Sequence, residues 1–259
     1  MPIAQSVPVP NRLLAALPSK DRERLLANCE QVELGFAEVL YRPGEPIKHV
    51  YFPIGSFISV VKSINDSANL EVGLVGNEGL LGITTMLGVD AAPFQALVQG
   101  AGSALRMTTT SFLHELEQNP ALQLELKRYL YVSMSQIAQT AACTRFHLVE
   151  ARLACWLLMT QDRAHSNHFH ITHVCLAYML GVRRVGITKA ANSLLKKNLI
   201  SYQRGAITIL DRVGLEAASC GCYLADKEIY ELILGVRVGA RNEPDTHGGW
   251  APINALVER

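Results

Sequence analysis

One stretch in the C-terminal half combines cationic, hydroxyl and amide side chains at helical spacing. A helix is predicted over residues 183–197, because Ile187, Ala190 and Leu194 recur on one face and would pack inward. The opposite face carries Arg184, Val185, Thr188, Lys189 and Asn192. Guanidinium, hydroxyl and amide groups can hydrogen-bond base edges in the major groove. The pattern therefore favours a helix that contacts double-stranded DNA.

The residues on either side predict a winged helix-turn-helix. Thr172 is a candidate N-cap for a short first helix, and Gly181 would end that helix because glycine tolerates a left-handed backbone. A hairpin is predicted over residues 200–210, with Arg204 at its tip and able to contact a phosphate. Gly186 lies inside the second helix at a cost of roughly 1 kcal/mol against alanine. Close approach to DNA or to the first helix would explain it.

Positive charge is concentrated in the same region, although the formal net charge of the chain is only +1. Residues 151–212 hold nine lysines and arginines against two acids. Residues 1–150 hold eleven against fourteen, and residues 213–259 hold four against seven. A basic segment between two acidic ones is the electrostatic footprint expected of a single DNA-binding domain.

Two other groups of residues could bind a metal or respond to oxidation. Four histidines precede the first helix, namely His165, His168, His170 and His173. Zinc or haem uses such ligands, but no cysteine or carboxylate pattern completes a tetrahedral site, so a polar loop is favoured. Cys220 and Cys222 would form a strained disulfide at best, which leaves thiol sensing as an alternative. We predict no cofactor and no metal ligand.

Motifs typical of enzymes and of membrane proteins are missing from the sequence. It contains no Gly-x-Ser-x-Gly, P-loop or His-Glu-x-x-His, and residues 32–107 lack the two-His-plus-Glu pattern of cupin metal sites. No apolar run approaches the ~20 residues that span a bilayer. The first residues lack the basic and apolar regions of a signal peptide. We therefore expect a non-enzymatic, cytoplasmic protein whose six cysteines are mostly reduced.

Two further regions must position the DNA-contacting helix. Between residues 32 and 107, short apolar runs alternate with turns, which is typical of an antiparallel sandwich or barrel. Nothing breaks a helix between residues 121 and about 151. An a/d seam lies along it: Leu130, Met134, Ile137, Ala141, Thr144 and Leu148. We predict that this seam is a homodimer interface; the alternative is an amphipathic helix packed on its own domain.

The order of these regions resembles the Crp/Fnr family of bacterial transcription regulators. The matching segments are residues 41–45, 150–154, 171–172, 176–177, 180–184, 199–200 and 204–209, in a resemblance that covers about residues 11–235. It implies an α+β fold with an N-terminal antiparallel β-roll of the cyclic-nucleotide-binding type, a long dimerisation helix and a C-terminal winged helix-turn-helix. The implied domains are a β-roll effector or sensor domain (11–120), the dimerisation helix (121–150), the DNA-binding domain (151–235) and a flexible tail (236–259).

The family's helix-turn-helix typically reads Gly-x-Ser-Arg-Glu-Thr-Val, which Gly181, Arg184 and Ile187 match here. The resemblance gives Arg184 a base or phosphate contact, with a guanine edge favoured, and Thr172 a phosphate contact. Three residues replace the usual Ser, Glu and Thr: Arg183, Val185 and Gly186. Since the missing glutamate would accept from cytosine, a different half-site is expected. The predicted DNA-binding set is Thr172, Arg183, Arg184, Val185, Gly186, Thr188, Lys189, Asn192 and Arg204.

The effector region departs further from the family. The family's cyclic-nucleotide pocket resembles Gly-Glu-Leu followed by Arg-Ser/Thr-Ala, and the corresponding residues here are Gly76, Glu78, Gly79, Leu80, Phe94 and Gln95. Phe94 stands where the phosphate-binding arginine is expected, so a buried phosphate would lack a charge partner. We predict no cyclic AMP binding by the usual mode. The cysteine cluster of the family's iron–sulfur sensors is also missing, since Cys29 stands alone in that region.

Taken together, these features predict a homodimeric regulator that binds near-palindromic double-stranded DNA. RNA polymerase and an unidentified small-molecule effector are implied partners, and no membrane partner is expected. Two alternatives stay open. One is a haem, metal or thiol-based redox sensor, or a metal-dependent enzyme that uses the histidines. The other is a ligand-binding β-roll module whose C-terminal helices dock a protein partner instead of DNA.

Overall fold

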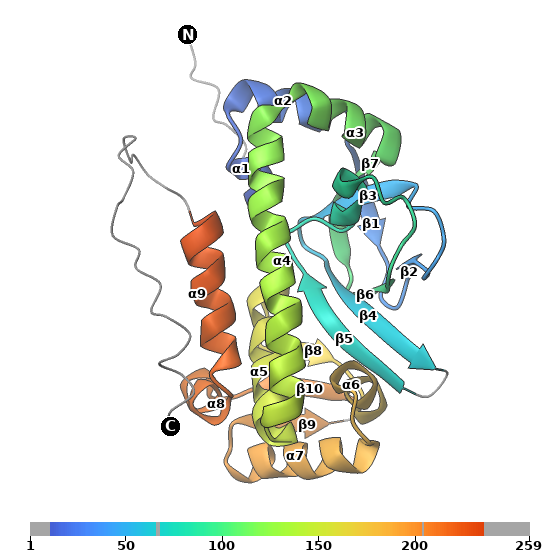
Figure 1. Cartoon of the computed structure of the whole chain (residues 1–259). Coiled ribbons are helices and arrows are strands. Elements are labelled where there is room, and N and C mark those ends of the chain that lie inside the picture. The colour runs from blue at the N-terminus through green and yellow to red at the C-terminus, as the bar shows by residue number, and fades with distance from the viewer. Residues whose placement is uncertain (1–10, 66–67, 204, 236–259) are drawn as a thin grey trace, which may run out of the picture.

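The computed structural model describes residues 11–65, 68–203 and 205–235 (Figure 1). Helices α1 (Arg12–Ala15) and α2 (Ser19–Ala27) precede an antiparallel roll made of two sheets. One sheet has the order β1-β7-β3 and the other β2-β6-β4-β5. Their bounds are β1 (Glu30–Leu34), β2 (Val39–Tyr41), β3 (His49–Pro53), β4 (Phe57–Asn65), β5 (Ala68–Val75), β6 (Gln95–Gly100) and β7 (Gly102–Thr108), with the 3-10 helix η1 (Ile83–Leu87) between β5 and β6.

The predicted strands of the roll are confirmed, and one strand was missed. The inward-facing residues of β3 and β4 are fully buried, among them Val50, Phe52 and Ile58, so the apolar pattern that predicted them reports real burial. Strand β1 was not predicted because only Leu34 among its residues is buried. A strand at the sheet's edge with four residues outside the core gives little apolar signal.

A long helix, α4 (Pro120–Phe146), follows α3 (Thr109–Gln118) and runs along the molecule (Figure 1). The Asn119 side chain caps it by accepting from the Leu122 amide, and proline is tolerated in its first turn. The prediction of an unbroken helix to residue 151 was wrong, because α4 ends at Phe146. His147 and Leu148 are extended, and α5 (Val149–Ala164) begins after them. No glycine or proline marks this break.

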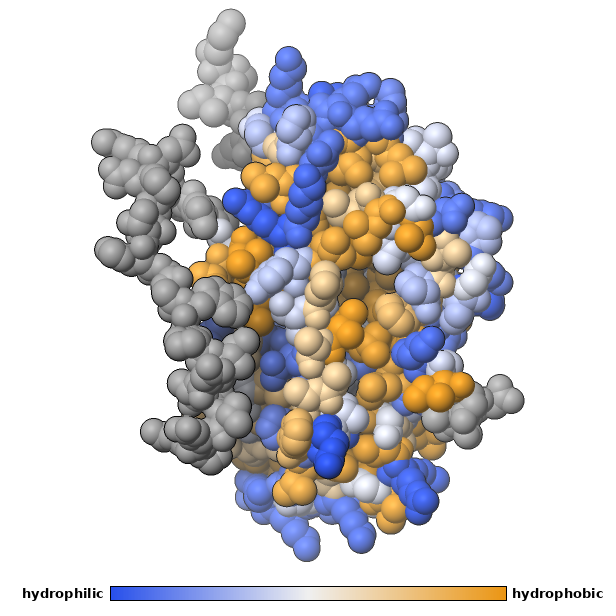
Figure 2. Space-filling model, viewed as in Figure 1, coloured by the Kyte–Doolittle hydropathy of each residue, from blue (hydrophilic) through white to orange (hydrophobic). Residues whose placement is uncertain are grey.

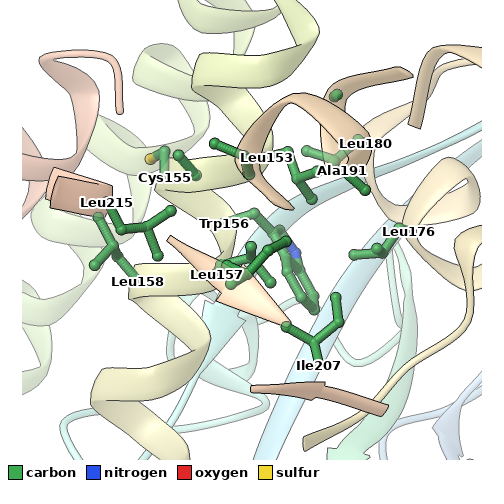
Figure 3. Packing of buried hydrophobic residues seen from close by; sticks show 14 of the residues in the cluster. Leu153, Cys155, Trp156, Leu157, Leu158, Leu176, Leu180, Ala191, Ile207 and Leu215 are labelled. Atoms are coloured by element: carbon green, nitrogen blue, oxygen red, sulfur yellow. The ribbon is translucent and has the colours of Figure 1, made fainter. Parts of the chain in front are cut away.

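The C-terminal part holds the predicted helix pair and wing. Its elements are β8 (His168–His170), α6 (His173–Leu180), α7 (Arg184–Lys196), β9 (Ile200–Gln203), β10 (Ala206–Ile209), α8 (Arg212–Ala218) and α9 (Cys222–Leu234). A three-stranded wing sheet has the order β8-β10-β9. Strand β8 was predicted as loop. Figure 3 shows the core, in which Trp156 and Leu157 of α5 pack among Leu176 of α6 and Ile207 of β10.

Two buried polar contacts join the roll to α5. The Trp156 indole donates to Glu71 Oε1 over 2.9 Å, and Arg163 pairs with Glu78 over 2.7 Å. Burial raises the pKa of Glu71 to about 7, although its hydrogen bonds from Ser59 and Trp156 oppose that shift. None of the helices in the described ranges is long and apolar enough to cross a membrane.

Candidate nucleic-acid interface

The first helix of the pair, α6, has the predicted ends. The Thr172 side chain accepts from the Cys175 amide over 3.2 Å, which satisfies one of the free N–H groups of the first turn. Gly181 ends α6 with a positive φ of 62°. A Cβ at Gly181 would lie 3.1 Å from the carbonyl oxygen of Asn69 in β5. Both the backbone angle and this close approach to the roll favour glycine there.

The second helix, α7, presents the predicted polar face to solvent. Ile187, Ala190 and Leu194 are buried against the domain core. The opposite face holds exposed side chains, namely Arg184, Val185, Lys189 and Asn192, and the exposed Arg183 stands at its N-cap. Within the described part of the chain, Arg183, Arg184 and Lys189 form no salt bridge. Their charges are therefore free to meet a polyanion.

Thr188 and His173 hold this face in place. The Thr188 hydroxyl donates to the Arg184 carbonyl over 3.1 Å and lies 3.2 Å from His173 Nδ1. The His173 ring stacks on Tyr202 of the wing with 4.4 Å between centroids. Burial, together with the charge of Arg184, lowers the pKa of His173 and so favours its neutral form. These contacts tie α6, α7 and β9 into one surface, and they engage Thr188 within the protein.

The charge count overstated the basic surface. Four of the nine cations between residues 151 and 212 have partners in the protein itself, although the Lys197 side chain stays 55% exposed. Arg152 donates to the Leu180 carbonyl, Arg163 pairs with Glu78, Lys197 with Glu150, and Arg212 with Asp162. The charge available to DNA is carried by Arg183, Arg184, Lys189 and Lys196. Arg204 lies outside the described residues, so its predicted phosphate contact stays a prediction.

Packing against α6 does not explain why residue 186 is a glycine. A Cβ placed on it would meet no described atom within 4 Å. Close packing on α6 is therefore ruled out as the reason for glycine. Gly186 is half-buried, and the open space beside it is compatible with close approach of a DNA backbone, the other reason considered.

The predicted seam of α4 is exposed in the single chain. Met134 is 63% exposed and Ile137 is 41% exposed, while Ala141 and Thr144 are also exposed and Leu130 is half-buried. The side of α4 that packs on the chain itself is a different one, carrying Leu122, Leu126, Tyr129, Val132 and Gln136. Leu148, which is 81% exposed, lies beyond the end of α4 and outside the helical seam. Figure 2 shows apolar surface along α4 and the adjoining roll.

A cavity of about 150 Å³ lies between the roll and α4. Leu80 and Phe94 of the predicted effector set line it, together with the seam residues Leu130, Met134 and Ile137. No charged side chain occurs among the described residues of its lining. The lining is mostly apolar, with a few uncharged polar side chains, and offers no cation to a phosphate.

The remaining residues of the predicted effector set are not gathered at this cavity. Glu78 is paired with Arg163, and Gln95 accepts from the Tyr178 hydroxyl over 3.0 Å. Gly76 and Gly79 pack against Arg163 and Tyr129 respectively. The sequence could not show that Glu78 is paired, because its partner Arg163 lies 85 residues away in the chain.

The histidines before α6 do not form a metal-ligating group in the described ranges. His168 Nδ1 lies 2.9 Å from the Thr208 hydroxyl, and His173 is engaged by Thr188 and Tyr202. A different group has metal-ligating potential: Cys143, His147, Cys220 and Cys222. The sequence analysis missed Cys143 and His147. Their i, i+4 spacing at the end of a helix was the available signal.

The chain was compared with known proteins both by sequence and by fold. Residues 151–218 match the family model described as a Crp-like helix-turn-helix domain. A solved structure described as a Crp/Fnr-family regulator from Eubacterium rectale superposes with a TM-score of 0.64, at 13% identity, covering 80% of this chain and 96% of the other. FixK2 from Bradyrhizobium japonicum gives 0.63 at 13% identity, with coverages of 74% and 98%.

A third structure, the Crp/Fnr-family regulator TTHA1359 from Thermus thermophilus, gives a TM-score of 0.61 at 20% identity and covers 73% of this chain and 98% of its own. No curated protein sequence matches the chain. Identities this low show a shared fold, while the helix-turn-helix match concerns the sequence itself. Residues 151–218 therefore form a Crp-like helix-turn-helix domain, and the chain shares its fold with solved regulators of the Crp/Fnr family.

Proposed function

We propose that this protein binds near-palindromic double-stranded DNA as a homodimer, with α7 of each chain in the major groove. The observation that carries the proposal is the exposed face of α7, whose Arg183, Arg184 and Lys189 form no salt bridge with the described residues. A helix with free cations and an amide on one face suits both phosphate contact and base readout. Two such helices would enter successive grooves about 34 Å apart.

The homodimer is supported by the uncovered seam of α4. Met134 and Ile137 are large apolar side chains that water would otherwise contact. Pairing of the same face from two chains buries both copies, and a two-fold axis suits a helix seam of this kind. The small side chain of Ala141 would let the helices approach closely. Leu148 is left out of the proposed seam because it lies beyond the break in α4.

We propose residues 11–120 as the effector or sensor domain, residues 121–146 as the dimerisation helix and residues 149–235 as the DNA-binding domain. The helix break at His147 and Leu148 supports a boundary there in place of residue 150. The family resemblance supports RNA polymerase as a further partner. The tail of residues 236–259 lies outside the described residues.

The cavity supports the expectation that cyclic AMP is not the effector. The cavity has a volume of about 150 Å³, comparable to a cavity that holds benzene. A cyclic nucleotide is much larger than benzene. Its described lining holds no cation, so a phosphate placed there would be desolvated without a counter-charge. The site fits a small apolar effector better than a nucleotide.

Calorimetric titration of cyclic AMP into the purified protein is expected to show no binding heat. The reason is the missing cation: Phe94, which lines the cavity, stands in the sequence where the resemblance to the family predicts an arginine. The same preparation should shift a selected DNA fragment, which shows that the protein is active. Saturable binding at micromolar concentration would contradict both the cavity argument and the sequence argument.

Arg184→Ala should cost about 1–3 kcal/mol of binding free energy on a cognate site and relax specificity at the contacted base. Arg184 is exposed, so the change should leave the fold intact. Genomic fragment selection with the unmodified protein supplies the site, and titration of both proteins on that site and on a scrambled one measures the effect.

Lys196→Ala is the matched control, because Lys196 is also exposed but lies at the far end of α7. It should weaken binding about equally on all sequences and reduce the salt slope by roughly one unit. If Arg184→Ala leaves affinity and sequence preference unchanged, α7 does not enter the groove as proposed. If no genomic fragment is retained at all, the docking of a protein partner by the C-terminal helices becomes the better account.

A further inference from the structure

Four potential metal ligands converge where the long helix meets the DNA-binding domain. Cys143 Sγ lies 3.6 Å from Cys220 Sγ, and Cys222 Sγ lies 3.4 Å from His147 Nδ1. All four ligand atoms lie within 4.8 Å of one another. The thiols are not joined by a disulfide, since an S–S bond is about 2.05 Å long.

These separations match a tetrahedral ion of the zinc class. Zinc binds thiolate at about 2.3 Å and imidazole at about 2.0–2.1 Å. On a tetrahedron, such bonds place the ligand atoms about 3.5–3.8 Å apart. The two close distances, 3.6 and 3.4 Å, agree with that spacing. We propose that Cys143, His147, Cys220 and Cys222 bind one Zn²⁺-class ion as a Cys₃His site.

The four ligands come from two segments of the chain, and each segment contributes two of them. Cys143 and His147 are one helical turn apart, and the chain leaves the helix at His147. Cys220 and Cys222 flank Gly221 at the start of α9. Packing of α9 beside α4 brings the pairs together (Figure 1). Two ligand pairs from distant segments are the usual composition of a structural zinc site.

The surroundings of the cluster also suit a bound cation. Gln139 Nε2 donates to Cys222 Sγ over 2.9 Å, the kind of outer contact that orients a thiolate ligand. Asp226 is buried, and its Oδ1 has no hydrogen-bond partner among the described residues. Asp226 lines the same cavity of about 70 Å³ as Cys143 and Cys222. An unpartnered oxygen on a buried carboxyl group is costly, so a polar group beside the cluster is left unsatisfied by the described protein atoms.

Charge and proton balance are consistent with such a site. Binding one divalent ion would release three thiol protons to solvent and leave a cluster of net charge −1. Arg152 lines the same cavity and supplies a positive charge close by. A soft, thiolate-rich set favours zinc over magnesium or calcium, which prefer oxygen ligands.

A bound ion would fix the position of the proposed DNA-binding domain relative to the end of α4. The ion would tie the last turn of α4 and the break at His147 to the α8–α9 segment of the DNA-binding domain. Removing the ion would loosen the contact between the end of α4 and the α8–α9 segment. It would therefore change how the DNA-binding domains are oriented on the dimer helix. This regulatory consequence rests on the proposed DNA binding, whereas ion binding itself does not.

The test uses the full chain, purified reduced and stripped of metal, and titrated with Co²⁺. Uptake of about one equivalent, with thiolate charge-transfer and tetrahedral d–d absorption bands, is expected for a Cys₃His site. Zn²⁺ should displace the signal stoichiometrically. Cys143→Ser and Cys222→Ser should abolish it, while Cys29→Ser, in the distant N-terminal part, should keep it.

Gln139→Ala retains all four ligands and should weaken Co²⁺ affinity by about 10- to 100-fold, so the test does not depend on variants that fail to fold. The proposal is overturned if the reduced protein shows no tetrahedral Co²⁺ spectrum, if Cys29→Ser loses the signal equally, or if only a Cys143–Cys220 disulfide forms. Gel shifts with the zinc-loaded and stripped protein test the regulatory consequence, and equal affinities overturn it. Loss of DNA binding in both forms would refute the proposed function and leave the metal site standing.

Discussion

Replacing Ile137 with glutamate should convert the proposed homodimer into monomers and weaken binding to the full DNA site by about 10²- to 10⁴-fold. Ile137 lies in the exposed seam of α4 and is already 41% in contact with solvent in the single chain. The monomer should therefore tolerate the charge. In the dimer, two carboxylates would be buried against each other along the two-fold seam, which is unfavourable for both chains.

The large effect on DNA follows from the geometry of two recognition helices. One chain contributes one α7, so a monomer contacts one half-site. Linking two such helices makes the second contact effectively intramolecular, and that gain disappears when the seam opens. Sedimentation velocity measures the mass, and titration of a full site and of a half-site measures the affinity. Binding to the half-site should be nearly unchanged.

Leu232→Glu provides the matched control, because Leu232 is an apolar residue of α9 that is 74% exposed and lies outside the seam. It should leave both mass and affinity as in the unmodified protein. A dimer that survives Ile137→Glu would show that chains pair through another surface. Equal losses from both variants would show that the measurement reports general damage by acidic substitution.

Sequence alone could predict the elements whose signal is local. The face of α7 was predicted because Ile187, Ala190 and Leu194 follow the helical period and are buried as that period requires. The ends of α6 were predicted because the Thr172 hydroxyl can cap a helix N-terminus and Gly181 can adopt the left-handed backbone of a helix C-terminus. Such features depend on neighbouring residues in the chain, so periodicity and residue type suffice.

Features that depend on distant partners could not be predicted. The break at His147 carries no glycine or proline, and α5, which begins after it, packs into a core built from distant segments. The basic surface was overcounted because Glu78, the partner of Arg163, lies 85 residues away. The cysteine and histidine cluster was missed for the same reason, since Cys143 and Cys220 meet only through the packing of α9 on α4.

Replacing Arg163 with methionine should lower the free energy of unfolding by about 3–5 kcal/mol. The Arg163 and Glu78 side chains are 9% and 10% exposed, so little water is available to replace the lost partner. Glu78 Oε1 accepts from Arg163 Nε over 2.7 Å, and Arg163 also donates to the Met159 carbonyl over 3.1 Å. Methionine keeps much of the volume but leaves a buried carboxylate without its counter-charge. Chemical denaturation followed by fluorescence and circular dichroism measures the change.

Arg106→Met is the control that separates burial from pairing. Arg106 pairs with Glu30 over 2.6 Å, but their side chains are 33% and 66% exposed, so its loss should cost only about 0–1 kcal/mol. Adding Glu78→Gln to Arg163→Met should recover part of the stability, because the orphaned charge is then removed. Equal costs for Arg163→Met and Arg106→Met would mean that water reaches Glu78 in solution. In that case the contact between the roll and α5 would be looser than its distances indicate, and Glu78 would be free to meet a ligand.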